Sequence, residues 1–172
     1  GADAEASMTL GFVEAVLGGE RKLTIARAAA DGHLVDETVT VRIPPGVTDG
    51  GRLRIPGKGG EGLGGGPPGD LWISVRVEPH PVFRRLGRDL ELDLPLTVKE
   101  AIEGARIEVP TLEGRVTLTV PPGTSSGTRL RMRGKGVPAG KGTPAGDLLA
   151  RVQIVVPRES SPELIAALEA LG

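Results

Sequence analysis

A long internal repeat constrains this sequence more than any other feature. The segment VTVRIPPGVTDGGRLRIPGKGG at residues 39–60 returns as VTLTVPPGTSSGTRLRMRGKGV at residues 116–137, an offset of 77 positions. The match continues without a gap from GPPGDLWISVRV at residues 66–77 to TPAGDLLARVQI at residues 143–154. A repeat of this length predicts two similar domains in tandem, because each copy forms the same supersecondary unit.

The repeated segments are patterned as β-strands. Gly (27 residues) and Pro (15 residues) are abundant, and they bound short segments in which apolar, often β-branched residues alternate with polar ones or run together. These segments are residues 39–43, 71–77, 90–94, 106–109, 116–120 and 148–156. The pattern predicts a mostly β fold, with two tandem, similar, small β-sandwich domains at residues 1–83 and 84–157.

A weaker echo upstream adds a short helical turn to each copy. FVEAVLGGERKLTI at residues 12–25 is similar to VKEAIEGARIEV at residues 98–109. In the second copy, Thr97 and Glu100 have the spacing of a capping box, in which each side chain bonds the backbone N–H of the other residue. Gly104 then stands where a helix of one or two turns can end.

The last segment, residues 158–172, has the pattern of an amphipathic helix. Ser161 is a favourable N-cap, Pro162 suits the first turn, and the acidic Glu163 suits the positive end of the helix dipole. Four apolar residues fall on one face at helical spacing: Leu164, Ile165, Leu168 and Leu171. A helix of about ten residues is marginal alone in water. Its apolar face therefore needs a partner, either the second repeat or a second chain.

Composition excludes several classes of function. The formal net charge of −1 gives no overall attraction to nucleic acid or to an anionic membrane. No apolar run approaches the roughly 18 residues that span a bilayer, so no membrane partner is expected. The sequence has no Cys and only two His, which excludes disulfides, thiol catalysis and Cys- or His-rich metal sites, and fits a reducing cytoplasm. Because the first residue is Gly rather than Met, we expect a fragment.

No group of residues has the spacing of a catalytic or cofactor site. His80 lies between two prolines, where a structural hydrogen bond is the better interpretation, and His33 lies in a polar loop. Asp70 and Asp147 follow a Gly at matching places in the two copies, which indicates repeated turn capping rather than paired catalytic acids. Residues 57–62 satisfy G-x-G-x-x-G, but a Gly- and Pro-rich segment follows instead of the helix that dinucleotide binding requires. We therefore predict no enzyme, metal or cofactor.

Two surface patterns leave binding functions open. One is a stripe of basic residues at alternating positions, which could follow a phosphate backbone or could be an ordinary solvated sheet face: Arg129, Arg131, Arg133 and Lys135. No aromatic residues alternate with this stripe to stack on bases. The other is a set of short alternating apolar stretches in the first copy: Met8-Thr9-Leu10, Leu23-Thr24-Ile25 and Leu71-Trp72-Ile73. These could line an open groove that takes up an extended peptide, although the pattern alone favours a buried core.

The motifs taken together resemble a known family. FVEAVLGGERKLTI is followed by a PPG…G..LR..G.G loop, by a strand opening with GDL, and by HPVFRRLGRDL at residues 80–90. This order is similar to the C-terminal substrate-binding region of DnaJ-type chaperones, and the likeness extends from about Met8 to the final helix. A J-domain with its His-Pro-Asp signature is absent from the sequence. AAADGHLVD at residues 28–36 stands where some members carry a Cys-rich zinc module, so the chain resembles the zinc-less class, including the curved-DNA-binding relatives.

The resemblance implies a co-chaperone that binds unfolded or partly folded polypeptides and delivers them to a DnaK-type ATPase. The implied client groove lies in the first repeat and comprises Met8, Leu10, Leu23, Ile25 and Ile73. Arg21 and Lys22 match basic positions that bind the acidic tail of the DnaK-type partner, whereas Asp36 has the opposite charge. The final helix is implied to form a homodimer. Since Ala150 stands where the first copy has Ile73, a second groove is expected to be shallower. Architectural DNA binding through the basic stripe is the alternative function.

Overall fold

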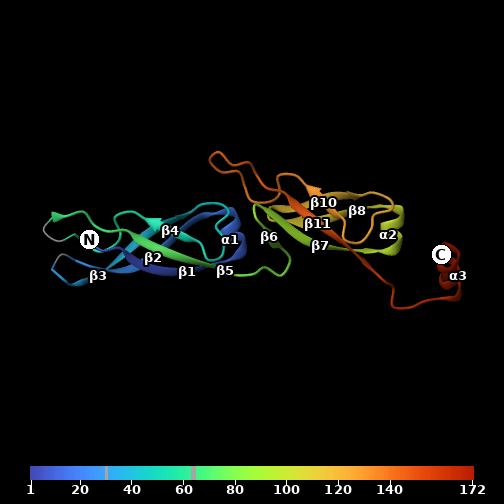
Figure 1. The fold of residues 1–172 in the computed structure, drawn as a ribbon, viewed down its shortest axis with the longest axis horizontal. Helices are drawn as coiled ribbons and strands as arrows, with labels where there is room; N and C mark the ends of the chain where they lie inside the picture. The colour runs from blue at the N-terminus through green and yellow to red at the C-terminus, as the bar shows by residue number, and fades with distance from the viewer. Residues whose placement is uncertain (30, 63–64) are drawn as a thin grey trace. The chain divides into compact units, whose positions relative to one another are not determined.

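A computed structural model describes residues 1–29, 31–62 and 65–172. The chain forms two compact units (Figure 1). The first comprises Gly1–Leu90 together with Arg133–Asp147, and the second comprises Glu91–Met132 together with Leu148–Gly172. The predicted class is confirmed, since strands dominate the fold and the helices are short. The domain boundaries at residues 83 and 157 stay predictions.

The first unit contains two small sheets that share one core. Its elements are β1 (Ala4–Leu10), α1 (Phe12–Leu17), β2 (Gly19–Ala28), β3 (Leu34–Ile43), β4 (Arg52–Ile55) and β5 (Leu71–Val77). One sheet has the order β1-β5-β4, with β1 parallel and β4 antiparallel to β5, and the other is the β2-β3 hairpin. Buried side chains from both sheets form the core: Met8, Leu10, Val41, Ile43, Leu71, Ile73 and Val75, with Ala15 and Val47.

The following strands repeat this arrangement. The elements are β6 (Arg84–Leu86), β7 (Asp89–Thr97), α2 (Val98–Glu103), β8 (Ala105–Thr111), β9 (Gly114–Val120), β10 (Arg129–Met132) and β11 (Leu148–Val155). They form a sheet of order β10-β11-β7-β6 and the β8-β9 hairpin. The register Leu130↔Ala150 repeats the register Leu53↔Ile73 at an offset of 77. The tandem duplication predicted from the sequence is therefore present in the fold.

Helix α2 has the predicted caps at both of its ends. Thr97 and Glu100 form the predicted capping box, with Thr97 Oγ1 accepting from Glu100 N at 3.1 Å and Glu100 Oε1 accepting from Thr97 N at 2.9 Å. Gly104 then ends α2 at φ 80°. A Cβ at Gly104 would lie 2.7 Å from the carbonyl oxygen of Val120, so both the backbone angle and the close approach require glycine.

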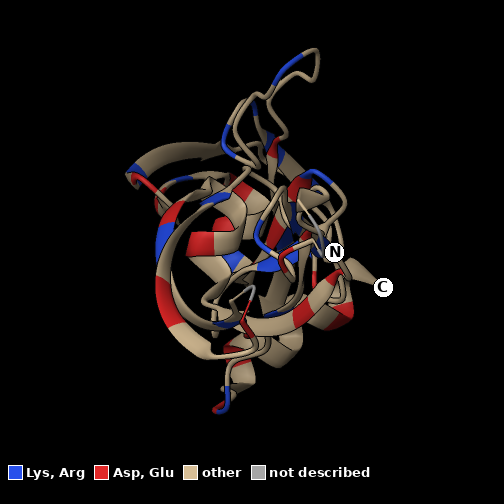
Figure 2. Ribbon diagram, turned by 90° about the vertical axis from the view of Figure 1, so that its left-hand side faces the viewer, with Lys and Arg blue, Asp and Glu red and all other residues tan. Residues whose placement is uncertain are grey.

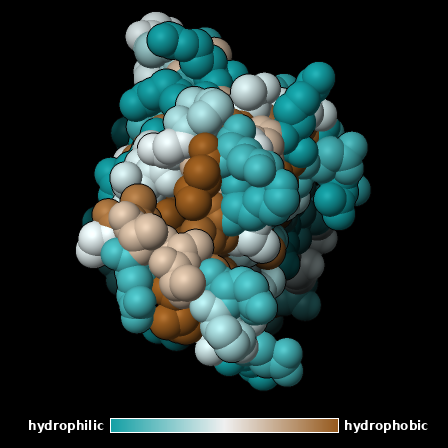
Figure 3. Space-filling view, turned by 90° about the vertical axis from the view of Figure 1, so that its right-hand side faces the viewer, coloured by the Kyte–Doolittle hydropathy of each residue, from teal (hydrophilic) through white to brown (hydrophobic). Residues whose placement is uncertain are grey.

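Helix α3 (Pro162–Leu171) confirms the predicted C-terminal helix. Ser161 Oγ accepts from Leu164 N at 3.1 Å, so Ser161 is the N-cap. None of its residues is buried, and its four apolar side chains are 36–81 % exposed. Hydrophobic surface gathers on the face of the molecule where α3 lies (Figure 3). At ten residues α3 is the longest helix of the described chain, which leaves no helical segment there that could cross a membrane.

Candidate functional site

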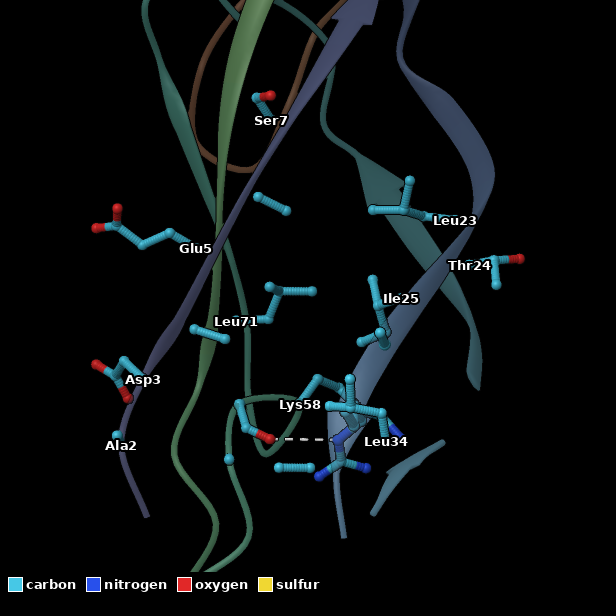
Figure 4. Close-up of a pocket in the computed structure, with 17 residues that line it drawn as sticks. Ala2, Asp3, Glu5, Ser7, Leu23, Thr24, Ile25, Leu34, Lys58 and Leu71 are labelled. Atoms are coloured by element: carbon cyan, nitrogen blue, oxygen red, sulfur yellow. Dashed lines mark hydrogen bonds between the residues drawn. The ribbon is translucent and has the colours of Figure 1, made fainter. Parts of the chain in front are cut away.

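A groove of about 550 Å³ lies in the first unit between β1 and β2 (Figure 4). Its apolar part comes from alternate residues of these strands and from the neighbouring β5 and β3. Leu23 and Ile25 on β2 are half-buried, and so are Ala4 and Ala6 on β1. Figure 4 shows Leu71 and Ile25 directed toward the space between the strands, whereas Thr24 points away. Leu71 is 2 % exposed and forms the floor, and Leu34 is 75 % exposed at the rim.

The strands beside the groove have open edges. β1 is an outer strand of the order β1-β5-β4, and β2 pairs only with β3 among the strands of the described residues. A strand with one open edge presents unpaired N–H and C=O groups to an extended chain. An apolar groove between two such edges can bind an extended peptide, with main-chain hydrogen bonds for affinity and side-chain contacts for selectivity.

Charged residues close one end of the groove. Arg27 Nη1 lies 2.7 Å from Glu37 Oε2, and Lys58 Nζ lies 2.7 Å from Glu37 Oε1. Arg27 also donates to the carbonyl oxygens of Gly57 and Gly59, each at 3.2 Å, and the bond to Gly59 is the dashed line in Figure 4. Hydrogen bonds from Lys58 and then from Arg27 lower the pKa of Glu37. This network ties the loop at residues 57–60 to the β2-β3 hairpin and fixes the groove's width at this end.

The structure divides the five residues predicted to bind clients. Leu23 and Ile25 line the groove. Met8, Leu10 and Ile73 are 8 %, 0 % and 0 % exposed and belong to the core. The expectation that all five form a solvent-accessible face is therefore wrong for these three. The physical reason is that Met8 and Leu10 belong to one buried cluster with Val41 and Ile43 of β3, whereas Ala4 and Ala6 on the same face of β1 line the groove.

A shallower groove in the second copy was predicted because Ala150 stands where the first copy has Ile73. The structure gives this argument no support. Both side chains are fully buried, 0 % exposed in each case. This exchange therefore changes the volume of the core and not the depth of a surface groove.

The predicted basic positions for a partner tail lie on β2 before the groove. Arg21 Nη1 donates to Thr9 O at 2.7 Å and lies 3.4 Å from Glu14 Oε1. Lys22 is exposed, and Asp36 lies opposite Ala26 in the hairpin. The guanidinium of Arg21 therefore bridges β2 to β1 and α1, and a role in tail binding stays a prediction for both basic residues.

Polar residues that could have suggested catalysis have structural roles. Asp70 Oδ1 accepts from Gly57 N at 3.0 Å, and Asp147 Oδ1 accepts from Gly134 N at 2.8 Å, which confirms the predicted turn capping in both copies. His80 Nδ1 accepts from the amide of Val82 at 3.0 Å.

The loops supply no cofactor site in the described part of the chain. His33 is exposed and lies 2.8 Å from an Asp31 carboxylate oxygen. No helix begins within residues 57–62 of the G-x-G-x-x-G match, and Leu63 and Gly64 after it lie outside the described residues. Across the described ranges no cluster of His, Asp and Glu could hold a metal ion.

The predicted basic stripe is divided between the two units. Arg129 and Arg131 on β10 belong to the second unit, whereas Arg133 and Lys135 belong to the first. Arg129 Nε lies 2.9 Å from an oxygen of Glu91, whose side chain is 6 % exposed. Figure 2 shows basic and acidic residues interspersed along the strands. The stripe therefore has less uncompensated charge than its sequence indicates.

Several groove residues were not predicted from the sequence. They are Ala4, Ala6, Leu34 and Lys58. Leu34 lies in the nine-residue insertion of the first copy, where it pairs with Ala28 and lengthens the hairpin beyond its counterpart in the second copy. The large apolar residues Leu34 and Val35 within this insertion were the available signal.

Comparison with known proteins identifies the family. Residues 4–157 match the family described as the DnaJ C terminal domain. The chain belongs to the DnaJ C-terminal domain family. It is 52 % identical over 126 residues to a "Chaperone protein DnaJ 2" of Aquifex aeolicus, and 51 % identical over 132 residues to a protein of the same name from Nocardia farcinica. It is also 44 % identical over 138 residues to a "Curved DNA-binding protein" of Salmonella paratyphi B.

These alignments cover 73 %, 77 % and 80 % of this chain, respectively. The chain spans only 34 % of the length of each of the two DnaJ proteins and 44 % of the curved DNA-binding protein. The likeness is therefore to the DnaJ C-terminal domain within longer proteins, and the predicted resemblance to that region is confirmed. All three relatives carry names of chaperones or of a DNA-binding protein, and none carries the name of an enzyme.

Proposed function

We propose that this DnaJ C-terminal domain is the client-binding part of a co-chaperone, and that it holds unfolded or partly folded polypeptides in the groove between β1 and β2. The observation that carries the proposal is the row of half-buried aliphatic side chains beside two open strand edges, with Leu23 and Ile25 at its centre. The mechanism is reversible binding with no bond chemistry, so the chain is not an enzyme.

The size of the groove sets the expected strength of binding. Burying one Leu-sized client side chain contributes about 1.5–3 kcal/mol before the cost of ordering the client. A groove of about 550 Å³ takes only a few such side chains. One groove therefore binds weakly, and a homodimer through α3 strengthens binding by raising the effective concentration of the second groove.

The proposal includes the partners that the family resemblance implies. Clients held in the groove pass to a DnaK-type ATPase, and Arg21 and Lys22 contribute to contact with the acidic tail of that ATPase. The relatives named as DnaJ chaperones support this part. A cytoplasmic location, consistent with the absence of Cys, belongs to the same proposal.

A substitution in the groove tests the proposal. Replacing Leu23 and Ile25 by Ser removes apolar contact area from the groove, so we expect the chain to lose its suppression of aggregation of a denatured reporter protein. Because both side chains are half-buried, we also expect a loss of about 2 kcal/mol in the free energy of unfolding. Aggregation is followed by light scattering and stability by denaturant titration.

The second repeat provides the matched control. Ile107 and Leu118 are half-buried aliphatic residues that face each other in the β8-β9 hairpin. Replacing both by Ser costs similar stability and leaves aggregation suppression unchanged, because client binding is confined to the first repeat. Equal loss of suppression in the two double variants, or full activity of the groove variant, contradicts the proposal.

Architectural DNA binding is the second candidate function. It is favoured by the 44 % identity to a protein named for binding curved DNA, and its residues are Arg129, Arg131, Arg133 and Lys135. The ion pair of Arg129 with Glu91 and the interspersed charges weigh against it.

A further inference from the structure

A pocket of about 770 Å³ lies in the first unit, at the end of the β2-β3 hairpin that is remote from its turn. Its walls come from the end of α1, from the two strands of the hairpin and from the loop at residues 140–143. It shares no lining residue with the groove between β1 and β2. Three cationic side chains and one carboxylate line this space, which we call the basic pocket: Arg42, Arg88 and Lys141, with Glu20.

The hairpin contributes more positive than negative charge on the side of the basic pocket. Arg42 lies directly opposite Glu20, and both residues are exposed. Opposed residues of an antiparallel pair point to the same side, and so do alternate residues of one strand. The exposed Lys22 therefore faces the same side as Glu20, whereas Arg21 faces the other side. The single carboxylate of Glu20 thus lies beside two cations.

A tight turn presents Lys141 at the opposite wall of the pocket. Gly140 N donates to Thr143 O at 3.0 Å, and Thr143 N donates to Gly140 O at 3.2 Å, so the backbone of the turn is closed on itself. Arg88 donates to backbone carbonyls on both sides of this turn, from Nη2 at 2.7 Å and from Nε at 3.3 Å. Arg88 therefore fixes the loop from which the exposed ammonium group of Lys141 extends.

A second guanidinium lies beside that of Arg88. A Cβ built on Gly46 would lie 3.5 Å from Arg88 Nη1 and 4.0 Å from Arg85 Nη2, so the two side chains meet above this glycine. Burial, and then the charge of Arg88, lower the pKa of Arg85. Both guanidinium groups donate to backbone carbonyls, which satisfy their N–H groups but leave their charges in place. Across the described residues, no carboxylate pairs with Arg42, Arg85, Arg88 or Lys141.

The repeated fold does not require these cations. Thr119 of the second copy stands at the position of Arg42. Ala2 of the first copy stands at the position of Arg88, because the carbonyl oxygens of both residues accept equivalent loop amides. Both copies form the same hairpin and the same loop contact with neutral residues at these positions. The gathering of positive charge around the basic pocket is therefore a property of this site and not of the scaffold.

We propose that the basic pocket binds an acidic segment of a polypeptide, whose carboxylates pair with Arg42 and Lys141. Arg88 holds the loop of Lys141 in place and adds its charge to the attraction. Charge-assisted hydrogen bonds from guanidinium and ammonium groups to carboxylates are stronger than neutral ones. The site is separate from the client groove, so it adds a second class of polypeptide ligand to the proposed function.

The shape of the site favours an acidic peptide over DNA. Duplex DNA carries its phosphates along a rod and is bound by cations spread over an open surface, whereas Arg42, Arg88 and Lys141 surround one pocket. Apolar side chains complete the walls and suit the main chain and the methylene groups of acidic residues: Leu17, Ile43, Pro44 and Pro45.

NMR titration of the full chain tests this proposal. The probe is a short blocked peptide of Glu, Gly and Ser, and the comparison peptide carries Gln in place of each Glu. We expect the Glu peptide to shift the amide signals of Gly19, Gly140 and Thr143 and to leave the methyl signals of Leu23 and Ile25 unchanged. The Gln peptide should bind about tenfold more weakly, because it lacks the charges that pair with the pocket.

Charge variants assign the binding to this pocket. Arg42→Gln combined with Lys141→Gln changes two exposed side chains, so the variant should keep the stability of the parent and bind the Glu peptide about tenfold more weakly. Glu20→Gln removes the carboxylate of the pocket and should tighten binding about threefold. The matched control is Arg106→Gln combined with Arg115→Gln, which removes the same charge from exposed positions of the β8-β9 hairpin and should not change the affinity.

The outcomes distinguish this proposal from the client groove. Equal affinities of the Glu and Gln peptides, or equal losses in the two double variants, overturn the basic pocket and leave the groove in place. A short DNA duplex that shifts the same amide signals at a lower concentration than the Glu peptide assigns the site to phosphate groups and also overturns the proposal. Replacing Leu23 and Ile25 by Ser should leave binding of the Glu peptide unchanged, so failure of the groove does not affect this test.

Discussion

Glu37 joins three parts of the first unit through one carboxylate. It lies on β3 and pairs with Arg27 of β2 and with Lys58 of the loop that closes the groove. Arg27, Glu37 and Lys58 are far apart in the sequence. No sequence pattern shows which charged residue will pair with a charged residue on an exposed strand. The network was therefore not predictable, whereas the capping roles of Asp70 and Asp147 were, since each follows a Gly at the opening of a repeated strand.

Glu37→Gln is expected to lower the stability of the first unit at neutral pH, because both ion pairs lose their anion. Hydrogen bonds from Lys58 and then Arg27 lower the pKa of Glu37 in the folded chain, so its stabilising contribution is fully present above the unfolded-state pKa of about 4.3. That contribution is lost as pH falls through the lower, folded-state pKa. The free energies of unfolding of parent and variant should therefore differ at pH 7 and converge at strongly acidic pH.

Glu108→Gln serves as the control, since Glu108 is an exposed carboxylate on β8 of the second copy. Denaturant titrations of this variant should match the parent at both pH values. A difference between parent and Glu37→Gln that persists at acidic pH contradicts the role assigned to the ion pairs.

At the scale of elements, periodicity predicted which segments are strands but not where a face is covered. β1 directs Ala4, Ala6, Met8 and Leu10 to one face, and burial along this face increases from half-buried to buried. Alternation identifies the face, because side chains point to opposite sides of a strand in turn. Alternation does not show where along β1 this face joins the buried cluster that includes Val41 and Ile43 of β3, so the groove prediction included Met8 and Leu10.

Helix α3 has an apolar face that stays exposed in the described part of the chain. Since so short a helix is marginal alone, we expect two chains to pair through its face. Deleting residues 162–172 should halve the mass measured by light scattering at unchanged secondary structure of the two β units. Leu168→Glu should have the same effect, and Glu169→Gln on the same helix should have none. A deletion variant with the mass of the parent contradicts dimerisation through α3.

At the scale of the whole molecule, duplication was the most predictive feature of the sequence. The insertion at residues 28–36 of the first copy indicated where its hairpin is longer than that of the second copy. Matched residues such as Asp70 and Asp147 have the same structural role in the two copies. The repeat did not predict correctly what the exchange of Ile73 for Ala150 means. The sequence shows that these side chains differ in size, but it does not show that both lie in the core. The two copies therefore share a scaffold, and they differ in the insertion at residues 28–36 and in the size of matched core residues.

The charge of the whole molecule determines how the two candidate functions respond to salt. With a net charge of −1 and with Arg129 paired to Glu91, at most three cations of the basic stripe can neutralise DNA phosphates. Counterion release then lowers DNA affinity roughly 40-fold between about 50 and 200 mM salt, whereas apolar client binding in the groove changes little.

Replacing Arg131 and Arg133 by Gln should remove DNA binding and leave aggregation suppression intact. The same change at the exposed Arg115 and Arg158 should alter neither DNA binding nor aggregation suppression. The measurements are DNA retardation and reporter aggregation at both salt concentrations. If aggregation suppression falls with salt as steeply as DNA binding, the groove is not the client site and charge, rather than apolar contact, holds the client.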